Sequence, residues 1–425
     1  MPTVVVFSPS LQGHRQTYCR VLAQILLEDG SDVVVVAGAD AVSSVTGRRT
    51  VQLEELEARE GYRFIGLPES GVARLQRSPR GFIRLLDDLR ADAVVLTEAD
   101  VMLRVLTHRG ARRGAPRRWV GVFIRSTNYV HEASRPSGSV LRTAVRGSRK
   151  AARRVRRWRT DPWLFHEALL PRANLLDAAL YLDETFVATH PRGALWLPDI
   201  STSRPWSAAG DGEETRRWEL ELGRFMAGQG RRPVFVYLGA PQSRRGYDTL
   251  LRLAVAEDGC FVHCGRNEIA EPRDEPGARR ELRERGRLFE TAASYEDDAT
   301  ADLFLRRAAA VVLPYDHHLG SSGVMLQALA AGRPVLVPDE GLMARRVRAC
   351  GLGRTYRPGD WDDLRRTCRA LFQEGPARYG PGIEAFIARF SRAQTEAAVR
   401  HAMGYGAAPA APPAPVRDAA RSEAS

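Results

Sequence analysis

The sequence is poor in cysteine and has no long apolar run. Five cysteines among 425 residues are too few, and odd in number, for a disulfide framework, so we expect a reducing compartment. Cys260 and Cys264 flank a strand-like segment without a second Cys/His pair at zinc spacing, which favours small core residues over a metal site. No stretch approaches the ~20 apolar residues of a transmembrane helix, and the N-terminus lacks the basic and apolar regions of a signal peptide. These absences predict a cytoplasmic protein.

Lysine is nearly absent, although the formal net charge is +12. Lys150 is the single lysine, so arginine carries the charge, a bias more typical of GC-rich coding than of a function. Nine basic residues and no acid lie in 142–159. This segment has three interpretations: a solvated helical face, a peripheral contact of residues 140–165 with the anionic inner face of a membrane, or an anionic acceptor site. No nucleic-acid motif accompanies the charge, so no nucleic acid is expected as a partner.

Short β-branched runs alternate with helical patterns along most of the chain. This alternation predicts an α/β fold with mainly parallel sheets covered by helices on both faces. A Pro-, Gly- and Ser-rich stretch near 200–211 interrupts the pattern, which then restarts. We therefore predict two doubly wound Rossmann-like domains that face a cleft. The predicted parts are domains at 1–200 and 212–385, a C-terminal helix at 386–405 that packs back toward the first domain, and a disordered tail at 406–425.

One stretch, 309–339, organises the second half. It reads as a buried strand, a Gly-Ser-Ser-Gly loop at 320–323, a helix at 324–331 and another strand. Such a loop is suited to an anion, because its free N–H groups and the helix dipole favour negative charge. The dipole contributes only ~0.3–1 kcal/mol when exposed, so a diphosphate would need cations from elsewhere. An ordinary serine-capped loop explains the spacing equally well. The polar loop 8–15 follows the first strand in the same way, and both loops should face the cleft.

Several segments of the second half resemble the donor domain of family-4 glycosyltransferases of the GT-B fold. They occur in the family's order: a strand, loop and basic-Gly segment, a second strand, the approach to the site, the site itself, and a Pro-Gly-Asp turn. The first half is less similar, through Gly13-His14 and Leu197-Pro198-Asp199. The resemblance spans roughly residues 3 to 400. The matching segments of the second half are 234–249, 261–266, 302–314, 320–341 and 357–360.

The resemblance implies a sugar transfer from a nucleoside-diphosphate sugar to an acceptor bound mainly by residues 1–200. The acceptor would be a glycan, a lipid-linked molecule or a small molecule. The resemblance also implies retention of anomeric configuration, no metal and no cofactor besides the donor. Charge builds on the leaving diphosphate, so preorganised donors aimed there act mainly in the transition state. Arg245 and His14 are the implied catalytic residues. The implied donor-binding residues are Gly13, Arg244, Arg245, Gly320, Ser321, Ser322, Gly323, Val324 and Gln327.

Two departures from the family affect the site. Leu319 and Gln327 stand where the family has two glutamates eight positions apart. Gln327 keeps an acceptor oxygen for ribose hydroxyls, but Leu319 cannot hold a sugar. Candidates to replace it at the donor sugar are Asp316, His317 and His318, which could equally be exposed loop residues.

The lost glutamates keep an alternative open, namely a catalytically silent relative that binds a sugar nucleotide or glycan, or acts as a partner subunit. A third possibility is a protein that binds anionic surfaces through its basic segment.

Two further features have structural interpretations. Asp360-Trp361-Asp362 has the form of a metal-binding Asp-x-Asp motif, but its place before a helix favours an N-cap. His263 alternates within a strand and is expected in the core.

Overall fold

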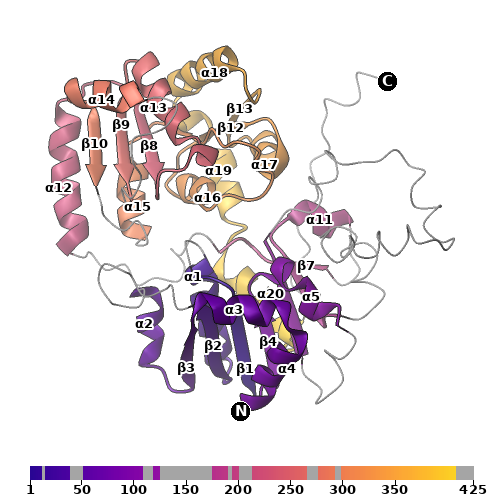
Figure 1. The fold of residues 1–425 in the computed structure, drawn as a ribbon. Helices are drawn as coiled ribbons and strands as arrows, with labels where there is room; N and C mark the ends of the chain where they lie inside the picture. The colour runs from indigo at the N-terminus through magenta and orange to yellow at the C-terminus, as the bar shows by residue number, and fades with distance from the viewer. Residues whose placement is uncertain are drawn as a thin grey trace, which may run out of the picture. The chain divides into compact units, whose positions relative to one another are not determined.

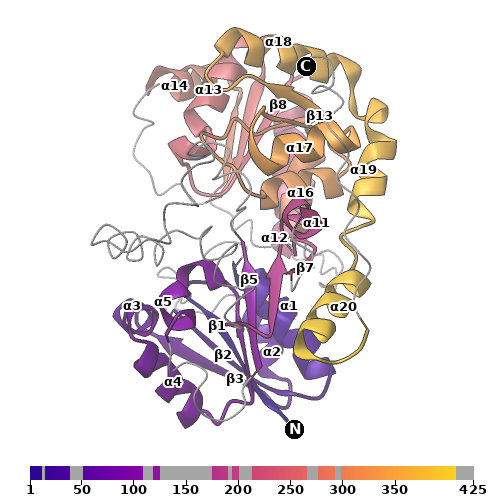
Figure 2. The same cartoon turned by 90° about the vertical axis from the view of Figure 1, so that its right-hand side faces the viewer.

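The computed structural model describes most of the chain as two compact units. Among the described residues, the first contains those of Met1–Ile200 and those from Arg392 to 407, and the second contains those of Ser201–Ser391. Figures 1 and 2 show both units, each with parallel strands between helices. The predicted α/β fold with two doubly wound Rossmann-like domains is confirmed. The described residues are 1–11, 15–38, 51–108, 118–124, 175–189, 194–200, 213–265, 276–291 and 298–407.

The first unit contains a parallel sheet of seven strands in the order β3-β2-β1-β4-β5-β6-β7. Valine-rich runs form its centre because both faces are covered, as in Val4–Val6, which have no exposed surface. The strand order reverses between β1 and β4. The strands are β1 Thr3–Ser8, β2 Asp32–Gly38, β3 Tyr62–Leu67, β4 Ala93–Leu96, β5 Arg118–Phe123, β6 Ala178–Tyr181 and β7 Ala194–Trp196.

Helices cover both faces of this sheet. Figures 1 and 2 show α3, α4 and α5 on one face, and α1, α2 and α20 on the other. Ser78 separates α3 from α4, and its Oγ accepts a hydrogen bond from Gly81 N at 3.1 Å, which caps α4. The helices are α1 Arg15–Glu28, α2 Val51–Glu57, α3 Glu69–Arg77, α4 Pro79–Asp88, η2 Ala99–Val101, α5 Leu103–Leu106, α11 Glu184–Thr189 and α20 Arg392–Met403.

The second unit contains two three-stranded parallel sheets, in the orders β10-β9-β8 and β11-β12-β13. Because β11 contacts β8, the strand order reverses between these two strands. Ligands of open α/β sheets bind at the carboxyl ends of strands beside such a reversal. The strands are β8 Val234–Leu238, β9 Cys260–Cys264, β10 Leu288–Thr291, β11 Val311–Val312, β12 Val335–Pro338 and β13 Gly353–Tyr356.

Two residues of the second unit settle expectations from the sequence. Asp360 caps α18, since its Oδ1 accepts from Asp363 N at 2.9 Å, so the N-cap interpretation is confirmed. His263 is fully buried, as predicted, and its Nε2 lies 2.8 Å from Gly239 O. The helices are α12 Glu213–Ala227, η4 Ser243–Arg245, α13 Tyr247–Ala256, α14 Pro276–Glu284, α15 Asp298–Leu305, α16 Gly323–Ala330, α17 Gly341–Cys350, α18 Trp361–Glu374, η5 Pro376–Arg378 and α19 Gly380–Ile387. No helix within the described ranges is long and apolar enough to cross a bilayer.

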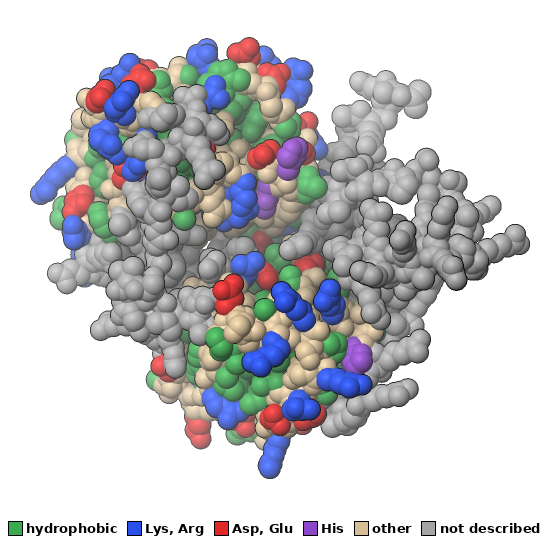
Figure 3. Space-filling model, in the orientation of Figure 1, with side chains coloured by type: hydrophobic (Ala, Val, Ile, Leu, Met, Phe, Trp, Pro, Cys, Tyr) green, Lys and Arg blue, Asp and Glu red, His purple; other side chains and the backbone are tan. Residues whose placement is uncertain are grey.

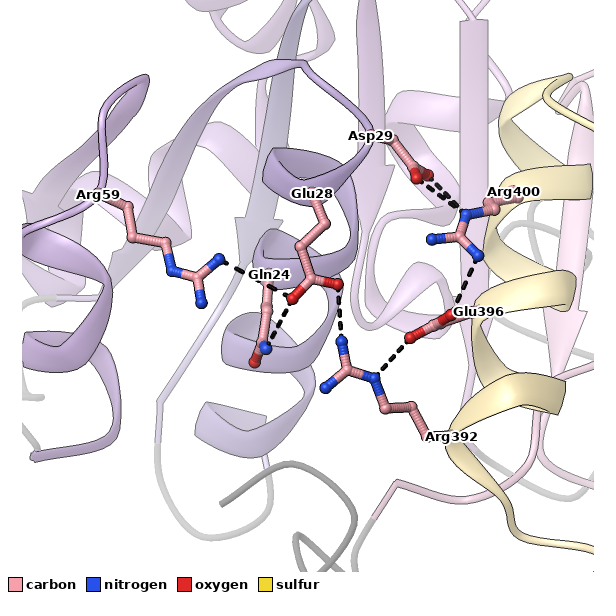
Figure 4. A network of polar contacts seen from close by, with 7 residues as sticks. All are labelled: Gln24, Glu28, Asp29, Arg59, Arg392, Glu396 and Arg400. Carbon is pink, nitrogen blue, oxygen red and sulfur yellow. Dashed lines mark hydrogen bonds and ion pairs between the residues drawn. The ribbon is translucent and has the colours of Figure 1, made fainter. Parts of the chain in front are cut away.

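The C-terminal helix is shorter than the predicted 386–405. α19 ends at Ile387, and α20 starts only at Arg392, because Ser391 precedes it and serine favours a helix start. α20 belongs to the first unit and contacts α1, β5, β6 and β7. Figure 4 shows the polar network that holds it. Its ion pairs are Arg392–Glu28 at 2.7 Å, Arg392–Glu396 at 2.6 Å, Arg400–Asp29 at 2.8 Å, Arg400–Glu396 at 3.0 Å and Arg59–Glu28 at 3.8 Å.

Candidate functional site

The loop between β11 and α16 is held in shape by the Ser322 hydroxyl. Ser322 is 5% exposed, and its Oγ accepts from Met325 N at 3.3 Å, which caps α16. The same hydroxyl donates to the Tyr315 hydroxyl at 3.3 Å. These two bonds use the hydroxyl within the fold. What Ser322 and the following Gly323 offer a ligand is therefore their backbone at the helix N-terminus.

A buried arginine lies behind this loop. Arg346, on α17, is 2% exposed and donates from Nη1 to Ser321 Oγ at 2.8 Å. The Ser321 carbonyl oxygen lies 2.8 Å from His318 Nε2, so both polar ends of Ser321 are fixed. Arg346 therefore places a buried guanidinium group directly against Ser321 of the loop. Sequence reasoning missed Arg346, because only the fold brings α17 to the loop. The Arg345-Arg346 pair, in the helix that follows a buried strand, was the available signal.

The segment after β8 contacts the same loop and carries Arg244 and Arg245. Asp316 N donates to Arg244 O at 3.0 Å. Gly246 has φ of +71°, and a Cβ there would overlap the carbonyl group of Pro314. Only glycine allows this approach of the two backbones. Arg244 is exposed and Arg245 is half-buried, and both belong to the segment whose backbone contacts the loop.

Arg245 lies within electrostatic range of a buried tyrosine at the end of β8. Burial raises the pKa of the Tyr237 hydroxyl well above its usual value, and the Arg245 cation opposes that shift. The Tyr237 hydroxyl donates to Ala240 O and accepts from Gln242 N, both at 3.1 Å. Tyr237 thus shapes the turn that leads from β8 to the two arginines.

A third segment, after β12, brings a carboxylate to the loop. Gly341 has φ of +71°, and a Cβ there would lie 2.7 Å from Leu319 Cα. Leu342 N donates to Leu319 O at 3.0 Å. Glu340 therefore stands beside position 319, and its Oε1, which is buried, has no hydrogen-bond partner among the described residues. The sequence analysis did not identify Glu340, because it follows its own strand and meets Leu319 only through the fold.

Histidines of the loop have different surroundings. His318 is half-buried and packs edge-on against Tyr315, with ring centroids 5.2 Å apart. The side chain of His317 is 85% exposed, and its Nδ1 lies 4.0 Å from Glu340 Oε1. Burial raises the pKa of the Tyr356 hydroxyl, and the charges of Glu340 and Asp316 raise it further. Glu340, Asp316 and His317 therefore form one polar group beside the loop.

The remaining predicted site residues divide between described and undescribed parts of the chain. Gly320, Val324 and Gln327 are half-buried, in the loop and on α16. Gly13, His14 and the segment 140–165 lie outside the described residues. The described part of the chain contains no group of three His, Cys, Asp or Glu side chains placed to hold a metal ion.

A second polar cluster, in the first unit, was not foreseen. Glu98 follows β4, is 8% exposed and forms an ion pair with Arg15 at the start of α1. Asp100 Oδ2 accepts from Ile124 N at 2.9 Å. Gln16 is 4% exposed, and its Oε1 accepts no hydrogen bond from the described residues. Two acids directly after a buried strand, in Thr97-Glu98-Ala99-Asp100, were the signal that could have pointed to this cluster.

Comparison with known proteins gives the fold but no close relative. No protein-family model matches the sequence. No curated protein matches it either. Among solved structures, the catalytic domain of starch synthase IV from Arabidopsis thaliana, bound to ADP and acarbose, is similar with a TM-score of 0.60 and 11% identity, over 95% of this chain and 99% of that one. The Anabaena protein HepE in complex with UDP is similar with a TM-score of 0.56 and 12% identity, over 95% and 100%.

A third similar structure carries a different activity in its name. A Listeria monocytogenes protein described as a UDP-N-acetylglucosamine 2-epimerase has a TM-score of 0.54 and 13% identity, over 96% of this chain and 98% of that one. At these identities the likeness is one of fold. The chain has the GT-B fold, which is common among glycosyltransferases, and the fold by itself does not fix the reaction.

Proposed function

We propose that this protein is a glycosyltransferase that moves a sugar from a nucleoside-diphosphate sugar to an acceptor hydroxyl. The observation that carries the proposal is the loop between β11 and α16, which joins helix-terminal N–H groups to three arginines at the strand-order reversal of the second unit. Arg346 lies behind the loop, while Arg244 and Arg245 stand at its edge. This combination fits a diphosphate, because its anionic oxygens point in several directions and need several hydrogen-bond donors at once.

In this proposal the arginines neutralise the leaving diphosphate. Arg245 contacts the phosphates directly, with Arg244 beside it, and the N–H groups of Ser322 and Gly323 bind the same oxygens. Arg346 acts indirectly by fixing Ser321. Because charge grows on the diphosphate as the glycosidic bond breaks, these groups act most strongly in the transition state. With arginine cations in this role, we propose that transfer needs no metal, and that the configuration is retained as in family 4.

The other end of the donor is proposed to meet hydroxyl-binding groups. Gln327, one helical turn along α16, would bind the ribose hydroxyls. Asp316, His317 and Glu340 would bind the donor sugar, since carboxylate oxygens accept hydrogen bonds from hydroxyls. Glu340 has a carboxylate oxygen without a hydrogen-bond partner among the described residues, and it lies beside Leu319, which stands where the family has a glutamate. Glu340 would therefore supply the carboxylate that Leu319 lacks.

The acceptor is proposed to bind the first unit. Glu98 and Gln16 supply buried acceptor oxygens at the carboxyl end of β4 and the start of α1, and His14 precedes that helix. Acceptor oxygens suit a molecule rich in hydroxyls, such as a glycan, a lipid-linked saccharide or a small polyol.

The experiment that tests the donor site is a thermal shift with UDP, GDP, ADP and TDP and their common sugar conjugates, with and without magnesium. A ligand that binds only the folded protein raises its apparent stability by mass action. We expect a shift with one nucleotide, unchanged by magnesium and lost in Arg245→Ala. Arg378→Ala, at an exposed arginine of η5, is the matched control and keeps the shift. No shift with any nucleotide would contradict the proposal.

A second candidate is a silent relative that binds a sugar nucleotide without transferring the sugar. Leu319 and Gln327 favour it, because both replace groups that family members use on the donor. Release of nucleoside diphosphate from the donor, measured with water and with a panel of acceptors, separates the two. Binding without release would favour the silent relative, while a change of sugar without release would indicate an epimerase.

A further inference from the structure

A group of arginines on the first unit has no acidic partner among the described residues. Several arginines of the second unit form an ion pair with a carboxylate, as Arg365 does with Glu257 at 2.7 Å and Arg279 with Glu290 at 3.0 Å. Five exposed arginines on α3, α4 and α5 form no ion pair with any described residue. We call this surface the α3–α5 face. Its arginines are Arg74, Arg77, Arg80, Arg84 and Arg104.

The α3–α5 face is continuous and held by the core beneath it. α3, α4 and α5 contact one another pairwise. Val72, Phe82 and Leu86 are buried on the inner sides of α3 and α4, so the arginines between them point outward. Figure 3 shows basic side chains gathered over these helices on the face turned to the viewer. The exposed acids of the three helices stand at the ends, Glu69 at the start of α3 and Asp87 and Asp88 at the end of α4.

We propose that the α3–α5 face docks on the surface of an anionic lipid bilayer. The argument is charge complementarity: arginines without partners on a helix-covered surface are attracted by acidic headgroups, each strengthening the association about fivefold when it reaches the surface. Leu75, Ile83 and Leu85, half-buried between the arginines, provide apolar contact at headgroup depth. The inference uses none of the residues 140–165 and does not rest on the proposed sugar transfer.

A lipid surface suits this face better than a nucleic acid does. Proteins that bind single strands stack bases on exposed aromatic rings, and the one aromatic residue of α3, α4 and α5, Phe82, is buried. Duplex readers insert a helix or ribbon into a groove, whereas these three helices lie packed side by side on a sheet. A lipid surface requires neither feature.

The test is co-sedimentation of the full chain with vesicles of phosphatidylcholine alone or with about 30 mol% phosphatidylglycerol, in about 0.1 M salt. The variant replaces four arginines by glutamine: R74Q, R77Q, R80Q and R84Q. The control makes the same charge change at four exposed, ion-paired arginines of the second unit: R280Q, R283Q, R366Q and R378Q. A second variant carries lysine at the four positions of the face, and thermal unfolding checks that each protein is folded.

We expect the wild-type chain to bind only the anionic vesicles, with binding weakened by salt. The glutamine variant should lose at least about tenfold, while the control stays within about twofold and the lysine variant keeps its binding. Equal losses in variant and control would mean that net charge alone acts, and would overturn the proposal. The proposal would also be overturned if the glutamine variant bound as well as the wild type, or if the wild type did not bind. Release of the wild type from anionic vesicles when a DNA duplex is added would overturn it as well.

Discussion

The two units share one architecture and carry opposite chemistry at their strand ends. In the second unit the loop after β11 combines glycine and serine with Arg245 and the buried Arg346. In the first unit the segment after β4 carries Glu98 and Asp100, both buried. The parallel sheet explains why a site forms at these ends, and the side chains decide which ligand it suits. In the proposed function, the second unit therefore binds an anion and the first binds a molecule that donates hydrogen bonds.

The largest effect should come from removing the contact that brings the arginines to the loop. Gly246→Ala places a Cβ against the Pro314 carbonyl group at a positive φ, and we expect a loss of about 3 kcal/mol or more in stability. Gly332→Ala is the control, because Gly332 has a similar φ of +73° with nothing within 4 Å, and should cost about 1 kcal/mol. Thermal unfolding measures both. Equal costs would show that the contact with Pro314 is unimportant.

The next largest effect should come from removing a charge at the candidate site of the second unit. Arg245→Ala should raise the dissociation constant for the nucleoside diphosphate about 10- to 100-fold, the effect of losing a hydrogen bond between charged groups. Arg245→Lys should recover part of it, because lysine keeps the charge without the bidentate geometry. Isothermal titration measures the constants. Unchanged affinity in the alanine variant would remove Arg245 from the site.

A smaller effect, confined to the other unit, is expected from Glu98→Gln. The change removes the charge that pairs with Arg15 but keeps the size of the side chain. We expect transfer to slow about tenfold while nucleotide affinity stays the same. Steady-state rates at saturating donor, together with titration of the nucleotide, check this. A loss of nucleotide affinity would contradict the division of roles between the units.

The smallest effect should follow Gln327→Glu on α16. A carboxylate accepts stronger hydrogen bonds from ribose hydroxyls than an amide does, so donor affinity should stay equal or rise about threefold. Titration with the sugar nucleotide measures it. Weaker binding would place Gln327 near the phosphates rather than the ribose.

Local signals explain which parts of the site the sequence could predict. The helix predicted at 324–331 is observed at Gly323–Ala330, because the Gly-Ser loop before it and Gly332 and Pro334 after it act on their neighbours in the chain. Arg346 and Glu340 were missed because they reach the loop through tertiary contacts from α17 and its start. Glu98 was missed for a related reason, since an acid after a strand resembles a solvated turn until its burial is known.

The fold was predictable to a similar degree. Val-rich strands such as β2 can be recognised in the sequence, because a strand buried on both faces is a continuous apolar run. α3 was not predicted, because it starts after Pro68 without a side-chain cap and only Gly71 and Val72 of its residues are buried. The break between α19 and α20 was also missed, because the residues on both sides of Ser391 favour helix.

The return of α20 to the first unit has a consequence for how the chain is made. Synthesis proceeds from the N-terminus, and domains generally fold as they emerge. The first unit lacks α20, one of the helices on one face of its sheet, until residues 392–403 exist, whereas the described residues of the second unit all precede Arg392. The unit that begins first is therefore finished last. The ribosome must therefore synthesise the described residues of the second unit before Arg392 and Arg400 can form their salt bridges with Glu28 and Asp29.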